Sequence, residues 1–120
     1  MMNWQTIFRH LQEQGFDVYP LGQHKGICTS PYIVLRNNGT TLGRGAEQAL
    51  YELLLYMPAD RISGFEDFIR EVKLAMNQLY PALKLVIQED IHYLDEEVRG
   101  CMTSLTYGVV KKSESNQVKG

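Results

Sequence analysis

Residues 49–57 read Ala-Leu-Tyr-Glu-Leu-Leu-Leu-Tyr-Met and are followed by Pro58. By composition alone the stretch permits a helix or a strand, because leucine favours helix and tyrosine favours strand. As a strand, it would place successive residues on opposite faces of a sheet. One face would carry Tyr51, Leu53, Leu55 and Met57, and the other Glu52, Leu54 and Tyr56. Both faces are then largely apolar, a pattern typical of a central strand or of a strand in a subunit interface.

A helix is predicted after this stretch. Ser63 and Glu66 have the spacing of a capping box, with serine at the N-cap and glutamate at N3. Arg70 follows Glu66 at the i,i+4 spacing of a favourable ion pair, and Pro81 closes the helix. Apolar residues recur at helical spacing at Phe65, Phe68, Ile69, Val72, Met76 and Leu79. This stripe predicts a helix that packs its apolar side on the core.

The chain after Pro81 predicts a β-hairpin. Apolar and polar residues alternate over residues 83–88 and again over residues 101–109. The residues between these two arms, 89–97, include five acids and neither lysine nor arginine. The last ten residues, 111–120, are rich in lysine, serine, asparagine and glycine, and we expect them to form a disordered tail.

Upstream of the central stretch, the sequence predicts a short helix, a strand and a flexible arm. The helix has Asn3 as its N-cap and Gly15 as its stop, and its apolar stripe is formed by Trp4, Ile7, Phe8 and Leu11. Residues 16–31 favour a loop or a short strand, and residues 32–36 a firm strand. Residues 37–48 contain three glycines and few apolar residues, which predicts a long mobile connection between two strands.

Length and composition limit the chain to one domain. Its 120 residues are 44% apolar and 22% charged with a net charge of −2, which excludes a disordered chain and a protein that coats nucleic acid. We expect one domain over residues 1–110. No apolar run is long enough to cross a membrane, and the N-terminus lacks the pattern of a secretory signal. A cytosolic site of synthesis and residence is therefore expected.

The cysteines and histidines do not form a metal-binding pattern. Cys28 and Cys101 lie far apart in the sequence, and we expect two reduced thiols that behave as small buried or half-buried hydrophobic groups. His24 and Cys28 are four residues apart, but the glycines beside them oppose a helix that would bring them together. Structural zinc requires about four convergent ligands. No cofactor is therefore expected.

The acidic segment is the strongest candidate for chemistry. It contains Glu89, Asp90, Asp95, Glu96 and Glu97, with His92 among them. Carboxylates beside a histidine could act as acid and base or bind a divalent cation. We favour a solvated hairpin tip, because the glycine and the spacing of a calcium loop are absent. The chain also lacks the motifs of phosphate loops and serine nucleophiles, so no catalytic residue is assigned.

Two local features are shared with a known class of proteins. Ser30-Pro31-Tyr32-Ile33-Val34-Leu35 stands before an asparagine-glycine turn, and residues 51–58 stand before a helix that ends at Leu79-Tyr80-Pro81. A strand over residues 101–110 then closes a chain of this size. In these features, and in the order of its elements, the chain resembles the small tail-terminator and tail-completion proteins of tailed bacteriophages and prophages. The resemblance covers nearly the whole chain.

This resemblance implies an α+β fold, a small mixed or antiparallel β-sheet with two α-helices packed on one face. It also implies a structural protein of the virion, without catalytic residues. Members of the family assemble as a homo-hexameric ring that caps the tail tube and joins it to the head-side connector proteins. DNA would pass through the lumen without specific binding. The protein would lie in the neck region of the tail after assembly in the cytoplasm of the bacterial host.

The expected assembly surfaces are the arm and the uncovered face of the central strand. The helices can cover only one face of the sheet, so the other face needs a partner. The expected interface residues are Arg36, Asn38, Thr40, Arg44, Leu54 and Tyr56. The acids of segment 89–97 are expected at a solvated tip or in the lumen, where negative charge would keep phosphates from binding. Two alternatives stay open: a stopper or adaptor of the head-tail connector, and a small ligand- or metal-binding domain that uses segment 89–97.

Overall fold

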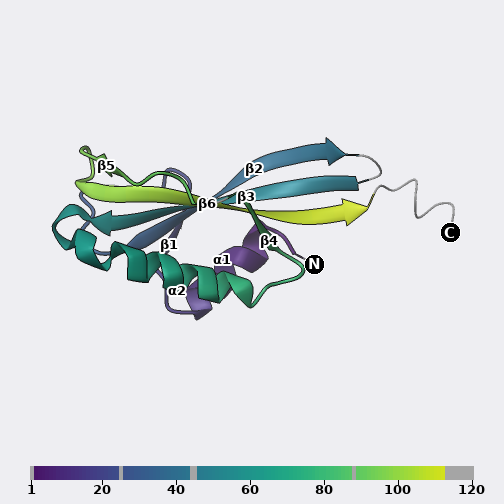
Figure 1. Ribbon diagram of the computed structural model, residues 1–120, viewed down its shortest axis with the longest axis horizontal. Coiled ribbons are helices and arrows are strands. Elements are labelled where there is room, and N and C mark those ends of the chain that lie inside the picture. The colour runs from purple at the N-terminus through teal and green to yellow at the C-terminus, as the bar shows by residue number, and fades with distance from the viewer. Residues whose placement is uncertain (1, 25, 44–45, 88, 113–120) are drawn as a thin grey trace, which may run out of the picture.

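Strands form one layer of the protein, and two helices lie on one side of them (Figure 1). The computed structural model describes residues 2–24, 26–43, 46–87 and 89–112, and the side chains of residues 41–47 and 110–112 are not part of that description. The elements are α1 (Trp4–Glu13), β1 (Val18–Pro20), β2 (Tyr32–Gly43), β3 (Ala46–Pro58), a 3-10 helix (Ala59–Gly64), α2 (Phe65–Asn77), β4 (Lys84–Ile87), β5 (Tyr93–Asp95) and β6 (Gly100–Lys112).

The strands form one mixed sheet. Within the described residues the sheet has six strands in the order β1-β2-β3-β6-β4, and β5 also pairs with β6. β1 runs parallel to β2, and every other pair is antiparallel. β6 has β3 on one side and both β4 and β5 on the other. β4 and β5 therefore form an interrupted edge strand of the sheet.

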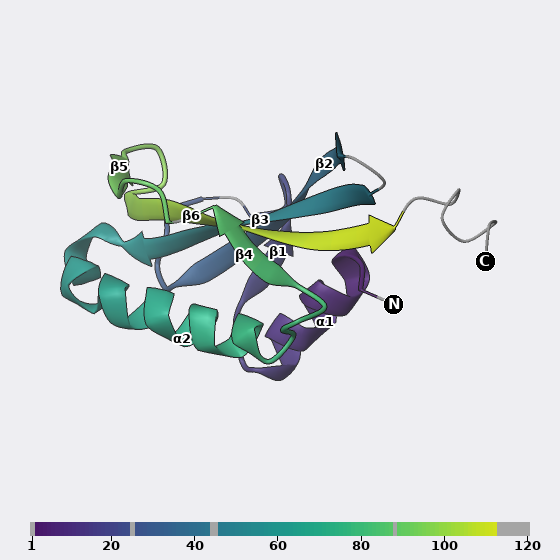
Figure 2. The ribbon, with the colours of Figure 1, turned by 45° about the vertical axis from the view of Figure 1, so that its right-hand side comes forward.

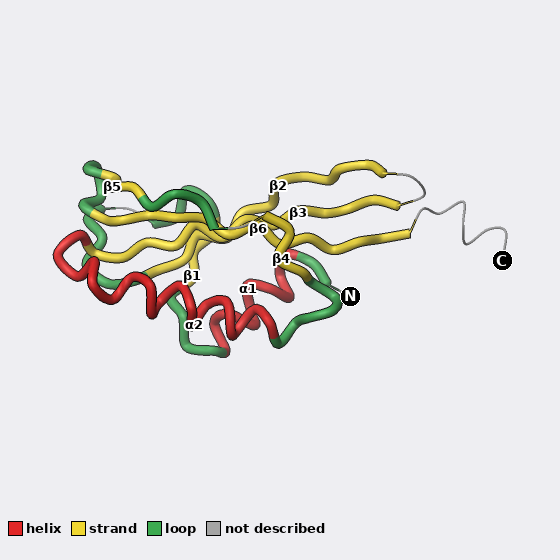
Figure 3. Tube along the Cα trace, viewed as in Figure 1, coloured by secondary structure: helices red, strands yellow, loops and turns green. Residues whose placement is uncertain are grey.

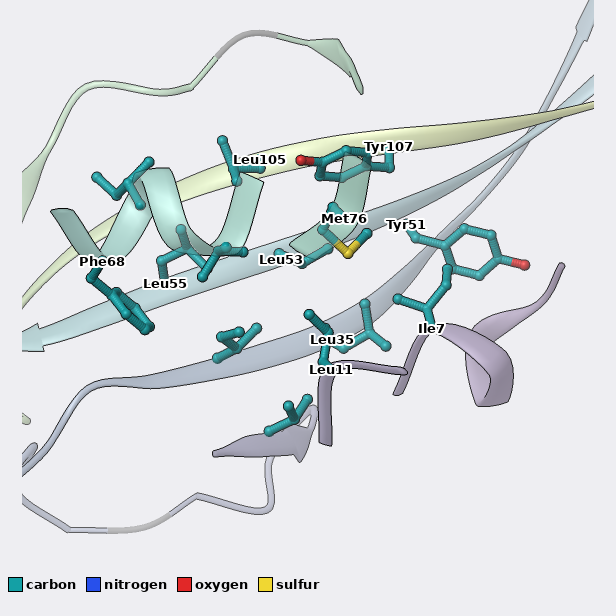
Figure 4. Packing of buried hydrophobic residues seen from close by; sticks show 14 of the residues in the cluster. Ile7, Leu11, Leu35, Tyr51, Leu53, Leu55, Phe68, Met76, Leu105 and Tyr107 are labelled. Atoms are coloured by element: carbon teal, nitrogen blue, oxygen red, sulfur yellow. The ribbon is translucent and has the colours of Figure 1, made fainter. Parts of the chain in front are cut away.

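The stretch at residues 49–57 is a central strand, as its two apolar faces predict. β3 lies between β2 and β6, and Leu53 stands opposite Leu35 on β2 and Leu105 on β6. All three side chains are fully buried. Figure 4 shows them in the core with residues of both helices. Leu55 of the same strand is also fully buried, so β3 supplies much of the apolar surface of the sheet.

Both helices cover the same face of the sheet, which confirms the predicted α+β class (Figure 2). α1 begins where Asn3 predicts, since the Asn3 side chain accepts a hydrogen bond from the Thr6 amide at 2.9 Å. The buried residues of α2 are Phe65, Phe68, Ile69, Val72, Ala75 and Met76. This set contains five of the six residues of the predicted stripe, and Leu79 is partly buried beside them.

The predicted capping box does not form. Residues 59–64 form a 3-10 helix, so α2 begins one residue later than expected and its N-cap is Gly64 without a side-chain hydrogen bond. Glu66 is then the second helical residue, and Ser63 lies outside the helix. The reciprocal contact of a capping box needs the glutamate at the third position. The Arg70 side chain forms its salt bridge with Asp67, three residues before it, at a distance of 2.5 Å. The ion pair with Glu66 that the sequence predicts is replaced by this contact.

The predicted mobile connection over residues 37–48 is wrong. β2 continues to Gly43 and β3 begins at Ala46, so the segment consists mostly of two paired strands. The pairing shifts register between Asn37 and Thr40, where Gly39 takes a φ of +88°. Backbone pairing needs few apolar side chains, and β6 supports β3 from its other side along its whole length. We call residues 37–43 of β2 with their partners 46–51 of β3 the arm, which projects beyond the helices in Figure 3.

The C-terminal hairpin is more complex than the alternating pattern predicts. β4 pairs with β6 as expected, but the chain then returns to β6 as β5, and the turn into β6 is formed by residues 96–99. The acids of segment 89–97 therefore do not share one hairpin tip. β6 itself continues to Lys112, so the expected tail begins at least two residues later than residue 111, and residues 113–120 lie outside the described part of the chain. None of the helices in the described residues is long and apolar enough to span a membrane.

Candidate assembly interface

The edge formed by β4 and β5 carries many exposed apolar side chains. We call residues 84–87 and 89–95 the apolar edge. The exposed residues are Leu85, Val86, Ile87, Ile91, Tyr93 and Leu94. An edge strand also presents backbone groups that can pair with another chain. Large exposed apolar patches mark interaction sites in soluble proteins. The apolar edge is therefore the strongest candidate for a binding surface in this protein.

The apolar edge is shaped by an excursion of the chain between its two strands. The pairing of β4 with β6 shifts register between Leu85 and Ile87, and the chain rejoins β6 at Tyr93. Between them, the Thr103 hydroxyl donates to the Asp90 carbonyl at 2.7 Å, and the Asp90 amide donates to the Ser104 carbonyl at 3.2 Å. These bonds hold the backbone of the excursion against β6. Ile91, next to this anchor, is 83% exposed.

Glu89 joins the apolar edge to α2. Its carboxylate accepts a hydrogen bond from Lys73 at 3.1 Å and another from His92, whose ring lies 4.9 Å from the Phe65 ring. Partial burial alone would raise the pKa of Glu89, but these two hydrogen bonds and the charges of their donors outweigh it and lower the pKa. The carboxylate is therefore occupied by contacts within the chain. It positions the edge and is not free to hold a ligand.

The other acids face different directions along the edge. Asp90 accepts a hydrogen bond from the Ile91 amide at 2.8 Å, and Asp95 accepts one from the Glu97 amide at 3.1 Å. Glu96 and Glu97 are exposed in the turn that leads into β6. Across the described residues, no group of three or more His, Cys, Asp or Glu side chains is placed to hold a metal ion. Three of the five acids lie within the apolar edge and two in the turn after it, and they make separate contacts.

A groove between α2 and β4 runs beside the apolar edge. It encloses about 270 Å³ and is lined by Arg70, Lys73, Leu74, Met76, Asn77, Tyr80, Leu83, Leu85 and Tyr107. Leu74 and Tyr80 are mostly exposed and extend the apolar surface from β4 onto the helix. Leu74 lies off the apolar stripe of α2, and a leucine at such a position is the signal in the sequence that could have indicated this groove. The groove adds depth to the candidate interface.

The opposite face of the sheet is partly covered by the chain itself. The rings of His24 and Tyr32 stack at 3.7 Å, and Tyr56 stacks on the other side of Tyr32 at 4.6 Å. Leu54 and Tyr56 are half-buried in a small cluster with Tyr32, Val34 and Cys28. The segment that follows β1 thus supplies some of the cover that we expected from a partner subunit. Leu54 and Tyr56 are therefore less accessible to a partner subunit than we expected for residues on the face that the helices leave uncovered.

Two of the remaining interface candidates lie on the exposed side of the arm. Asn38 and Thr40 are exposed. Arg36 lies 2.9 Å from a buried oxygen of Glu52 and donates a hydrogen bond to Asn38 at 2.9 Å, so its charge is partly engaged within the chain. Arg44 lies outside the described residues. β1 pairs only with residues 33–35, which leaves the outer side of β2 from Arg36 to Gly43 without a strand neighbour in the described structure.

The cysteines and His10 have structural roles. Cys28 and Cys101 are free thiols that are 3% and 5% exposed, as predicted for small hydrophobic groups. Burial raises the pKa of the Cys28 thiol to about 11, although the nearby charge of Arg61 lowers it. His10 donates a hydrogen bond to the Ala75 carbonyl at 2.8 Å and so ties α1 to α2.

Comparison of the sequence with known protein families and with curated proteins gives no match. The functional interpretation therefore depends on the surfaces described above.

Proposed function

We propose that this chain is a structural assembly protein that acts as a phage or prophage tail terminator, a subunit of a hexameric ring that caps the tail tube and joins it to the head-side connector. One observation carries the proposal: six large apolar side chains are exposed along the apolar edge, between residues 85 and 94. Burial of such a surface against another subunit removes apolar area from water and pairs the open edge.

A ring explains why one subunit would keep two different exposed surfaces. Each subunit of a closed ring makes the same heterologous contact with its neighbours, using one patch toward one neighbour and a different patch toward the other. The apolar edge and the part of β2 that extends beyond β1 lie on opposite edges of the described sheet. This separation suits a contact that repeats around a ring.

The arm and the acids support the role at a tail tube. Ala49 and Tyr51 anchor the arm in the core, and the far end of the arm extends beyond both helices, so it can reach a tube or a neighbouring subunit (Figure 3). Glu96 and Glu97 are exposed in the turn before β6. Negative charge at a lumen would let DNA pass, because cationic side chains are what bind phosphates.

The two alternatives differ in what supports them. A stopper or adaptor of the head-tail connector would use the same exposed surfaces, and the experiment below separates it from a terminator by the structure that the protein caps. A ligand- or metal-binding domain would use segment 89–97. Its strongest member, Glu89, is occupied by Lys73 and His92.

The proposal is tested by electron microscopy of tail tubes from the phage or prophage that encodes the chain. Tubes mixed with wild-type protein should carry a ring at one end and stop growing. Ile87→Asp should abolish capping, and Ile62→Asp is its matched control, because the two isoleucines are 56% and 59% exposed and Ile62 lies in the 3-10 helix. Absence of rings with wild-type protein would overturn the terminator, and binding to connector complexes instead of tubes would establish the stopper or adaptor.

A further inference from the structure

We propose that the apolar edge of one copy pairs with the outer side of β2, residues 36–43, of the next copy, so that the sheets of neighbouring subunits join edge to edge. The inference rests on the proposed function, because it specifies the contact that repeats around the ring. The partner is a second copy of this chain, and the two surfaces that meet are different.

Both surfaces are strand edges with open backbone groups. Along residues 36–43, β2 pairs on its inner side with β3, and its outer side has no strand neighbour in the described structure. β4 and β5 pair on their inner side with β6 and are likewise open on the outside. Addition of a strand to such an edge supplies main-chain hydrogen bonds, while the side chains set specificity.

The lengths of the two edges match. The open part of β2 covers eight residues, or about 27 Å at roughly 3.4 Å per residue. β4 and β5 together lie opposite residues 100–108 of β6, a span of about 30 Å at the same rise. The interruption between β4 and β5 limits where a strand can pair. This interruption therefore favours one register over many.

Charge favours this contact over pairing of two apolar edges. The apolar edge contains three acids against one lysine, and Glu96 and Glu97 follow it in the turn, so this part of the chain is negatively charged. Residues 36–43 of β2 contain one charged residue, Arg36, and no acid. Like charges placed opposite each other on paired strands are destabilising, and opposite charges are favourable. A two-fold contact of edge with edge would bring the acids of two copies together, whereas the contact proposed here places the acids of one copy beside a strand that contains none.

The contact is tested by site-directed cross-linking with a short bis-maleimide. Thr40→Cys places a thiol on the open part of β2, and Ile87→Cys places one on β4, while Ile62→Cys is the matched control away from both edges. The native thiols of Cys28 and Cys101 are buried, so wild-type protein measures the background. The two edge variants are mixed, and one of them carries a tag that increases its size. The mixture is cross-linked once without tail tubes and once in their presence.

We expect a cross-linked dimer of mixed size when Thr40→Cys meets Ile87→Cys, and no dimer above background from either variant alone or with Ile62→Cys. A chain with both edge substitutions should form a ladder of multimers. A dimer from Ile87→Cys alone would overturn the proposal in favour of a two-fold contact, and the absence of any mixed dimer would also overturn it. Capped tubes without the mixed dimer would refute this contact and leave the proposed function intact. The mixed dimer without capped tubes would support this contact and refute the proposed function.

Discussion

Two adjacent leucines of β3 provide a direct test of the fold, because they differ in burial and share a strand. Leu53 is fully buried beneath the helices, and Leu54 is half-buried on the opposite face. Leu53→Ala removes three carbons at about 0.8 kcal/mol each and leaves a cavity, so the free energy of unfolding should fall by about 3–4 kcal/mol. Leu54→Ala leaves a gap that solvent can enter and should cost about 1–1.5 kcal/mol.

The measurement is urea denaturation followed by far-ultraviolet circular dichroism. Both substitutions make the same change in strand propensity, so the difference between the two variants isolates burial. The slope of the free energy against urea should be unchanged and the midpoint lower. In a domain of this size a loss of about 3–4 kcal/mol corresponds to a melting temperature lower by about 10–15 °C. Equal midpoints for the two variants would refute the assignment of the covered face.

The remaining predictions concern α2, the apolar edge and the thiols. Phe68→Ala should lower the free energy of unfolding by about 3–5 kcal/mol, and an unchanged denaturation midpoint would show that the stripe of α2 does not face the core. Glu89 has a folded pKa below its ordinary value of 4.5, so its contribution to stability is present above pH 4.5 and lost as the pH falls through the folded pKa. The stability difference between wild type and Glu89→Gln should therefore shrink on acidification, and a difference independent of pH would contradict the role of its ionised contacts. Cys28 and Cys101 should react slowly with a thiol reagent at neutral pH and rapidly in denaturant, and fast reaction of the folded protein would contradict their burial.

Both helices could be predicted from the sequence because their signals are periodic. The stripe from Phe65 to Met76 depends on one face of one element, and burial of that face follows directly. Residues 49–57 permitted a helix or a strand by composition, and only their two apolar faces as a strand indicated a central place in the sheet. The Asn3 cap is also a local interaction, which four successive residues complete. Such features need no knowledge of the rest of the chain.

The features that the sequence did not predict depend on distant residues. The arm is paired in spite of its glycines because β6, more than fifty residues away, supports β3. The predicted capping box at Ser63 does not form, because residues 59–64 form a 3-10 helix that connects the end of β3 with α2. The acids of segment 89–97 separated because β5 returned to β6, a pairing of three residues that is too short to leave a pattern. For the candidate site, the exposed edge was visible only when the outer sides of β4 and β5 were known.

The pairing of β3 with β6 has a consequence for the order in which the protein can fold during synthesis. β3 pairs with β6 along its entire length, from Ala46 opposite Lys112 to Pro58 opposite Gly100. Contacts between residues so far apart in sequence form slowly, because a long loop must close first. Until the ribosome has released β6, β3 is itself an open edge with Leu53 and Leu55 lacking a neighbour on that side. The nascent chain must therefore hold its helices and first three strands in an incomplete state until β6, which follows the other described strands in the sequence, completes the centre of the sheet.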